Sequence, residues 1–150
     1  MTLEQRFSDD MKDAMRARDE LRLSVIRMIR SQILLEKKKG TGVTEVPDET
    51  VIGLVRGHAK RLKESIEAAR GAGREDLATQ AEKELVIAAA YLPAEAADEE
   101  IAALVAAAVA QSGATDMKQA GAVMKLVMEQ VKGRADGKRV QEFVRRALGA

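Results

Sequence analysis

Hydrophobic residues recur along almost the whole chain at spacings of three and four, which is the period of an α-helix. Four such stripes precede Pro93: Leu3, Phe7, Met11, Ala14 and Met15; Leu21, Val25, Met28, Ile29, Ile33 and Leu35; Val51, Val55, Ala59, Leu62, Ile66 and Ala69; Leu77, Ala81, Leu85, Ala88 and Leu92. No segment alternates with period two, the pattern of a half-buried strand. The pattern therefore predicts an all-α fold.

The pattern restarts after Pro93 with three shorter stripes: Ile101, Leu104, Val105, Ala108 and Val109; Ala120, Val123, Met124, Val127 and Val131; Val140, Phe143, Val144, Ala147 and Leu148. Proline cannot continue a helix, because it lacks the amide donor and its ring clashes with the preceding turn. We therefore predict two domains: an N-terminal four-helix domain over residues 1–92 and a C-terminal three-helix tail domain over residues 93–150.

Short polar residues and glycines mark the predicted helix ends. The candidate N-caps are Asp19, Asp98 and Thr115. Gly133 stands where a C′ glycine ends the sixth helix. Gly53 and Gly57 lie inside the third predicted helix, where each costs about 1 kcal/mol against alanine. We expect them to allow a close helix crossing.

Composition adds limits to this picture. Hydrophobic residues make up 46% of the 150 residues but aromatic residues only 2%, so the core must be aliphatic. The absence of cysteine excludes disulfides, thiolate catalysis and cysteine zinc sites, and it fits a cytoplasmic location. The N-terminus lacks the apolar run of a signal peptide, and no apolar run approaches the roughly 20 residues of a spanning helix. We expect no membrane association.

Residues that could carry catalysis are sparse. The single histidine, His58, lies within a predicted helix without a partner that would orient it. The serines stand in no nucleophile-elbow pattern, and phosphate-binding and dinucleotide fingerprints are absent. Glu64 and Glu67 are spaced to meet a cation, but a third ligand is not evident. We predict no catalytic residue, no metal site and no cofactor.

The distribution of charge says more about function than the candidate catalytic residues do, because charged residues are unevenly distributed along the chain. The net charge is only +1, and from Pro93 to Val131 there are 2 basic and 6 acidic residues. From Lys132 to Arg146 there are 6 basic and 2 acidic residues. The candidate nucleic-acid contacts are these six: Lys132, Arg134, Lys138, Arg139, Arg145 and Arg146. A polarised domain of this kind can steer a polyanion to one end.

Helix geometry favours phosphate contact at this end of the chain. Lys138, Arg139, Arg145 and Arg146 share about a third of the helix circumference, and the preceding loop feeds a helix N-terminus, which attracts anions. The scarcity of aromatics argues against base stacking. The alternative is a glycine-rich turn with a solvated face. If Asp136 is the N-cap, its carboxylate already satisfies the amide groups that would otherwise bind phosphate.

A second basic stripe lies in the second predicted helix and comprises Arg27, Arg30, Lys37 and Lys38, with Lys39 beside it. The run of three lysines ends that helix, where the helix dipole favours cations. A purely structural role is therefore the leading interpretation of this stripe.

Four segments in order resemble the YqeY family: "RLSVIRMIRSQI" (Arg22–Ile33), "KESIEAARGAGREDLA" (Lys63–Ala78), "YLPAE" (Tyr91–Glu95) and "VMKLVMEQVKGRADGKRV" (Val123–Val140). This family comprises stand-alone relatives of the tail of the GatB subunit of tRNA-dependent amidotransferase. The resemblance implies a helical domain followed by a three-helix tail that contacts tRNA. It also implies an association with carbon–nitrogen ligase activity that takes nitrogen from glutamine. Lys125 replaces a frequent glycine, and Gln141 replaces a usual asparagine.

The resemblance and the charge distribution together favour a cytoplasmic tRNA-binding accessory protein that is not an independent catalyst. The expected partner is tRNA, with an amidotransferase or an aminoacyl-tRNA synthetase as a possible protein partner. Two alternatives stay open. One is a protein–protein adaptor that docks on such an enzyme, and the other is a component of a glutamine-dependent amidotransferase.

Overall fold

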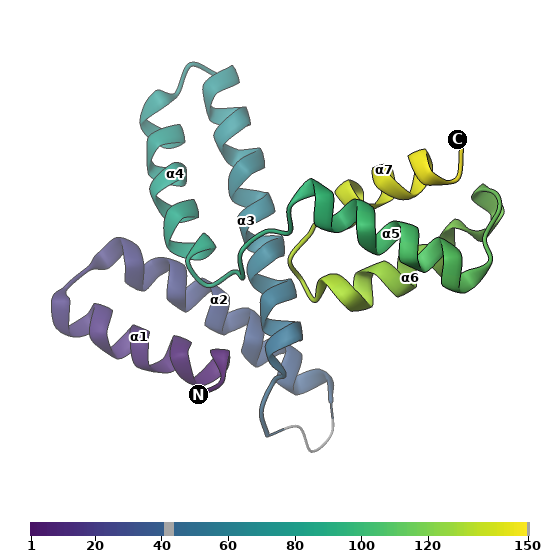
Figure 1. The fold of residues 1–150 in the computed structure, drawn as a ribbon. Helices are drawn as coiled ribbons and strands as arrows, with labels where there is room; N and C mark the ends of the chain where they lie inside the picture. The colour runs from purple at the N-terminus through teal and green to yellow at the C-terminus, as the bar shows by residue number, and fades with distance from the viewer. Residues whose placement is uncertain (41–43, 150) are drawn as a thin grey trace. The chain divides into compact units, whose positions relative to one another are not determined.

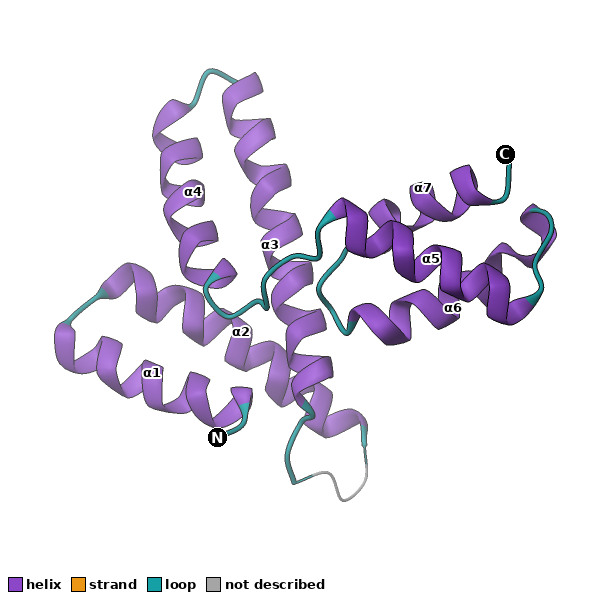
Figure 2. Cartoon of the chain, in the orientation of Figure 1, coloured by secondary structure: helices purple, strands orange, loops and turns teal. Residues whose placement is uncertain are grey.

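The computed structural model describes residues 1–40 and 44–149, and in these residues it is helical without any strand. The elements are α1 (Leu3–Ala17), α2 (Glu20–Lys39), α3 (Asp48–Gly71), α4 (Glu75–Ala89), α5 (Asp98–Ser112), the 3₁₀ helix η1 (Met117–Gln119), α6 (Ala120–Val131) and α7 (Gly137–Ala147). Figure 2 shows helices and loops and no strand in the described part of the chain. The predicted all-α class is confirmed. No helix in the described part of the chain is long and apolar enough to cross a membrane.

The contacts divide the chain into two compact units, Met1–Leu92 and Pro93–Ala150. In the first unit α1 and α2 form one helical hairpin, and α3 and α4 form another (Figure 1). Their apolar stripes meet in one core, whose largest fully buried side chains are Phe7, Ile26, Ile29, Val51 and Val55. The core is mostly aliphatic, as the composition requires.

Several apolar residues of the predicted stripes lie outside this core. Met15, Met28, Leu35 and Leu77 are 50%, 54%, 59% and 47% exposed. Their placement in the buried stripes was wrong, because each lies at the edge of its stripe or on the opposite side of its helix. Two of them, Met28 and Leu35, belong to α2.

The predicted close helix crossing at Gly53 and Gly57 is also wrong. A Cβ atom built on Gly53 meets nothing within 4 Å, and one on Gly57 meets only Nη1 of Arg61, a residue of the same helix, at 3.7 Å. Among the described residues of the first unit, no other helix therefore approaches either glycine. A stripe pattern locates the buried face of a helix but does not reveal whether a glycine on the other face has a neighbour.

The N-caps of the helices agree only in part with the N-caps predicted from the sequence. Asp19 caps α2 by accepting from the Arg22 amide at 3.1 Å, as predicted. Asp98 is instead the first residue of α5, after the N-cap Ala97. Thr115 is likewise not a cap, because Asp116 caps η1 by accepting from the Lys118 amide at 2.9 Å.

In the second unit α5, α6 and α7 pack against one another around a separate core. Its largest fully buried side chains are Ile101, Val105, Val123, Val127, Val131, Val140 and Val144. Each of the three helices contributes at least two of them, so the helices orient each other. This core fixes which side of α7 faces solvent.

Candidate nucleic-acid interface

The turn between α6 and α7 holds the middle of the basic segment. Lys132 and Gly133 both have left-handed backbones, with φ of 49° and 79°, which reverses the chain directly after α6. A glycine suits this conformation, whereas Lys132 adopts it at some cost. Ala135 is only 2% exposed and joins the core, so it holds the turn against the unit.

Asp136 is the N-cap of α7, and its Oδ1 accepts from the Lys138 amide at 3.3 Å. The carboxylate thus lies at the helix N-terminus, where an incoming phosphate would otherwise find free amide groups. An anion that meets this end of α7 also meets this carboxylate, so its attraction must come mainly from side chains.

Arg134 is held by the protein itself. Its Nη1 and Nη2 donate to the two carboxylate oxygens of Glu100 at 2.6 and 2.8 Å, and its Nε donates to the Ala94 carbonyl at 3.2 Å. The Ala96 amide in turn donates to the Arg134 carbonyl at 2.8 Å. These bonds clamp the α6–α7 turn to the segment that leads into α5. The hydrogen bond from Arg134 is the main reason that the pKa of Glu100 lies below its ordinary value.

Arg139 is engaged in a similar way. Its Nη2 donates to Oδ1 of Asp98 at 2.5 Å. Asp98 and Glu100 both lie in the first turn of α5. Asp98 was predicted to be an N-cap, but the sequence contained no signal that would pair Asp98 and Glu100 with two arginines 41 and 34 residues away.

The other four predicted contact residues are exposed: Lys132, Lys138, Arg145 and Arg146. Within residues 1–40 and 44–149, none of them forms an ion pair with a carboxylate. The Arg146 guanidinium lies 5.4 Å from the centroid of the Phe143 ring, which steadies it. Glu142 is also exposed and lies on the same side of α7. We call the surface formed by the four cations the α7 basic face.

The second basic stripe, on α2, also contains cations with partners and cations that are exposed. Lys37 forms an ion pair with Glu4 of α1, and Lys39 pairs with Glu36 at 3.0 Å. Arg30 lies 2.9 Å from the sulfur of Met11. Arg27 and Lys38 are exposed. Part of this stripe therefore stabilises the first unit, which supports its structural interpretation.

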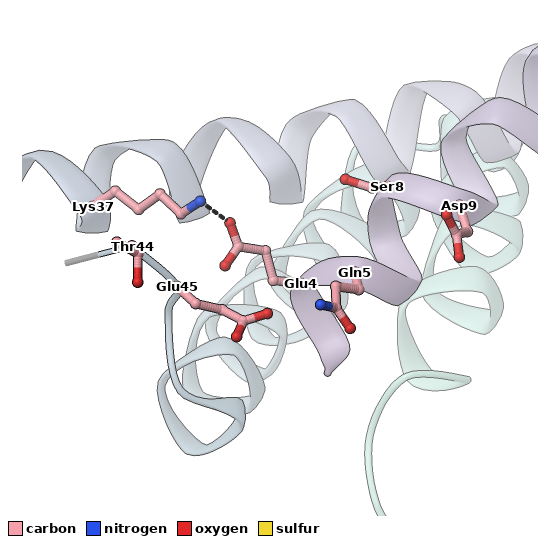
Figure 3. A pocket seen from close by; sticks show the side chains of 7 residues that line it. All are labelled: Glu4, Gln5, Ser8, Asp9, Lys37, Thr44 and Glu45. Carbon is pink, nitrogen blue, oxygen red and sulfur yellow. Dashed lines mark ion pairs between the residues drawn. The ribbon is translucent and has the colours of Figure 1, made fainter. Parts of the chain in front are cut away.

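The Glu4–Lys37 pair lies in an open pocket of about 280 Å³, drawn in Figure 3. The pocket is lined by Glu4, Gln5, Ser8, Asp9, Lys37, Thr44 and Glu45. Glu4 also accepts from the Val46 amide at 2.9 Å. Burial alone would raise the pKa of Glu4, but Lys37 and this amide outweigh burial and lower it. The pocket thus marks where α1 is tied to α2 and to the segment before α3.

His58 is half-buried on α3. Burial lowers its pKa, and the nearby Arg61 lowers it further, although Glu84 opposes the shift. Its neutral form is therefore favoured, which fits a packing role. In the described ranges no group of three or more histidine, aspartate or glutamate side chains is placed to hold a metal ion.

Comparison with known proteins agrees with the resemblance seen in the sequence. The model of the YqeY-like protein family matches residues 4–148. One curated relative is the "Altered inheritance of mitochondria protein 41, mitochondrial" of Pyrenophora tritici-repentis (strain Pt-1C-BFP), with 33% identity over 150 residues. The alignment covers 97% of this chain and 80% of the relative. The chain therefore belongs to the YqeY-like family.

Proposed function

We propose that this protein is a tRNA-binding accessory protein and that it contacts the phosphate backbone through the α7 basic face. The observation that carries the proposal is the division of the six predicted contacts. Arg134 and Arg139 are held by Glu100 and Asp98, whereas the four cations of the α7 basic face project to solvent without an ion pair in the described part of the chain. We further propose that residues 1–92 and 93–150 are separate domains, with the tail domain presenting this face.

The chemistry of the face suits phosphate rather than bases. Lysine and arginine side chains bind phosphate oxygens regardless of sequence, and Phe143 is the one aromatic residue in the sequence of residues 93–150. Asp136 occupies the N-terminus of α7, and Glu142 lies among the cations, so both carboxylates weaken the attraction. We therefore expect modest affinity that falls steeply with salt, because each phosphate contact releases counterions.

A salt titration of tRNA binding tests this assignment. The variant Lys132→Ala/Lys138→Ala/Arg145→Ala/Arg146→Ala removes the four exposed cations. Each lost contact should flatten the plot of log affinity against log salt by about one unit, so the slope should drop by about three to four. Fluorescence anisotropy with labelled tRNA measures the slope.

A matched control removes the same charge elsewhere. The variant Lys12→Ala/Lys60→Ala/Lys63→Ala/Lys83→Ala deletes four exposed lysines of the first unit and has the same net charge. This control variant should retain most of the wild-type slope of log affinity against log salt. Equal losses in both variants would mean that net charge, not the α7 basic face, carries binding, and the proposal would then be wrong.

A second pair of variants separates the two kinds of cation. Lys138→Ala should lower the slope by about one unit, whereas Arg139→Ala should change it little, since Asp98 already occupies that guanidinium. If Arg139→Ala flattens the slope as much as Lys138→Ala does, Arg139 reaches phosphate and its assignment to an internal ion pair is overturned.

A further inference from the structure

Helix α2 has apolar residues on two sides. Its inner side buries Ile26, Ile29 and Ile33 in the core of the first unit. On its outer side Met28 and Leu35 are 54% and 59% exposed. A helix of a globular protein normally has a single apolar stripe, and large apolar side chains clustered on the other side mark an interaction surface.

The outer side of α2 is uneven along its length. Its N-terminal half holds an open groove of about 330 Å³, lined by Glu20, Leu23, Ser24, Arg27, Met28 and Ser31. Its C-terminal half carries the projecting side chain of Leu35. One end of the helix therefore offers a hollow and the other end offers the side chain that could fill it.

Residue spacing along this side suits a pair of packed helices. The exposed residues Ser24, Met28, Ser31, Leu35 and Lys38 follow one another at intervals of four, three, four and three. This is the seam of a coiled coil, in which large side chains of one helix enter spaces on the other. Here large residues alternate with serine. The Ser31 hydroxyl donates to the Arg27 carbonyl at 3.0 Å, so covering it leaves no unpaired donor.

We propose that this surface binds a second copy of the same chain, with the two α2 helices antiparallel about a two-fold axis. In this arrangement Leu35 lies opposite Ser24 of the second copy, over its groove, and Met28 lies opposite Ser31 of the second copy. Because the axis relates the copies, each contact occurs twice. Both grooves are thus filled by side chains of the other copy.

Charge selects the second copy and its direction. The side begins with the acid Glu20 and ends with the cation Lys38, and neither forms an ion pair within the described ranges. Antiparallel pairing brings Glu20 of one copy close to Lys38 of the other, whereas parallel pairing would set like charges together. The antiparallel order also sets opposite helix dipoles side by side. The two ends of this side are therefore complementary to each other, whereas Arg27 between them adds a further cation.

Sedimentation equilibrium of the RNA-free full-length protein tests the proposal. The expected result is a reversible monomer–dimer equilibrium between about 1 µM and 1 mM, since a single helix pair is a small interface. Leu35→Glu places a carboxylate at the seam and should weaken dimerisation at least tenfold. Val86→Glu is the matched control, because Val86 is 72% exposed on α4, outside the seam, and should leave the equilibrium unchanged.

Charge exchange tests the direction of pairing. Glu20→Lys and Lys38→Glu should each weaken the dimer about fivefold, and the double variant should return to within about twofold of the wild type. Circular dichroism verifies that each variant is folded. A monomer over the whole range, a dimer insensitive to Leu35→Glu, or a double variant weaker than both single variants would each overturn the proposal.

Discussion

Two places where the chain changes direction are stabilised in opposite ways. At the end of α4, Tyr91 is 6% exposed and its ring stacks on Phe7, with centroids 4.0 Å apart. Before α7, Arg134 is clamped to Glu100, and both side chains are more than a third exposed. The first unit thus uses a buried aromatic anchor, and the second uses an ion pair at the surface. The difference shows that a cation close to a turn can be structural without being buried.

The contacts of the Tyr91 side chain explain why it is expected to stabilise the first unit strongly. Its hydroxyl donates to Asp10, which also lies 3.6 Å from Arg22 and 3.8 Å from Arg6. The Arg6 guanidinium lies 4.5 Å from the centroid of the Tyr91 ring. The ring therefore combines apolar burial with a satisfied hydroxyl, and a buried aromatic ring contributes more than an exposed ion pair does.

The largest expected effect follows from removing this anchor. Tyr91→Ala deletes a buried ring and should destabilise the first unit by about 3 kcal/mol, because it loses apolar burial and leaves a cavity beside Phe7. Tyr91→Phe keeps the ring and loses only the hydrogen bond to Asp10, which should cost about 1 kcal/mol. Urea unfolding followed by circular dichroism measures both. Similar losses for the two variants would contradict the dominant role of the ring.

Tyr91 can also be observed directly, because it is the single tyrosine and the chain has no tryptophan. Burial, followed by the hydrogen bond to Asp10, raises the pKa of Tyr91 from 10.0 to about 12. A raised pKa favours the protonated phenol, so this contribution to stability is complete below pH 10 and is lost between about pH 10 and pH 12. Absorbance at 295 nm should show ionisation near pH 12 in the folded protein and near pH 10 in urea. A transition near pH 10 in the folded protein would show that the ring is not enclosed.

The sequence predicted the helices better than the contacts between them. The period of the apolar stripes is local information, and it was sufficient for the all-α class and for the approximate helix ranges. Phe7 and Tyr91 lie 84 positions apart, so nothing local indicated that they stack. Arg134 was identified from its charge, and Glu100 is one of the six acidic residues counted between Pro93 and Val131, but pairing them requires knowing how α5 packs beside α7.

The same limit applies to the candidate site. Six basic residues were identified from their density in the chain, which does not distinguish a cation facing solvent from one beside a carboxylate. Helix periodicity placed Lys138, Arg139, Arg145 and Arg146 on one side of α7, yet Arg139 lies close enough to α5 to reach Asp98. Only the packing of three helices separates these roles.

An intermediate loss of stability is expected when the ion pair between Arg134 and Glu100 is removed. Glu100 has a lowered pKa, so its contribution is present above its ordinary value of 4.5 and is lost as the pH falls through the lowered value. Arg134→Ala should lower the melting temperature of the second unit at pH 7, by less than Tyr91→Ala lowers that of the first. It should also reduce the loss of stability between pH 5 and pH 3. Thermal melts over this range measure both, and an unchanged pH profile would show that Glu100 does not depend on Arg134.

The smallest effect should come from Arg139→Ala. Its partner Asp98 has a side chain that is 70% exposed, and exposed ion pairs contribute about 0.5 kcal/mol or less because water and salt screen them. Arg139 also lacks the second carboxylate oxygen and the carbonyl contact that Arg134 makes. We expect a barely measurable loss of stability at low salt and none at 1 M salt, in urea unfolding of the full-length protein. A loss as large as that of Arg134→Ala would mean that the two arginines act as one unit, and a double variant that loses less than the sum would confirm the coupling.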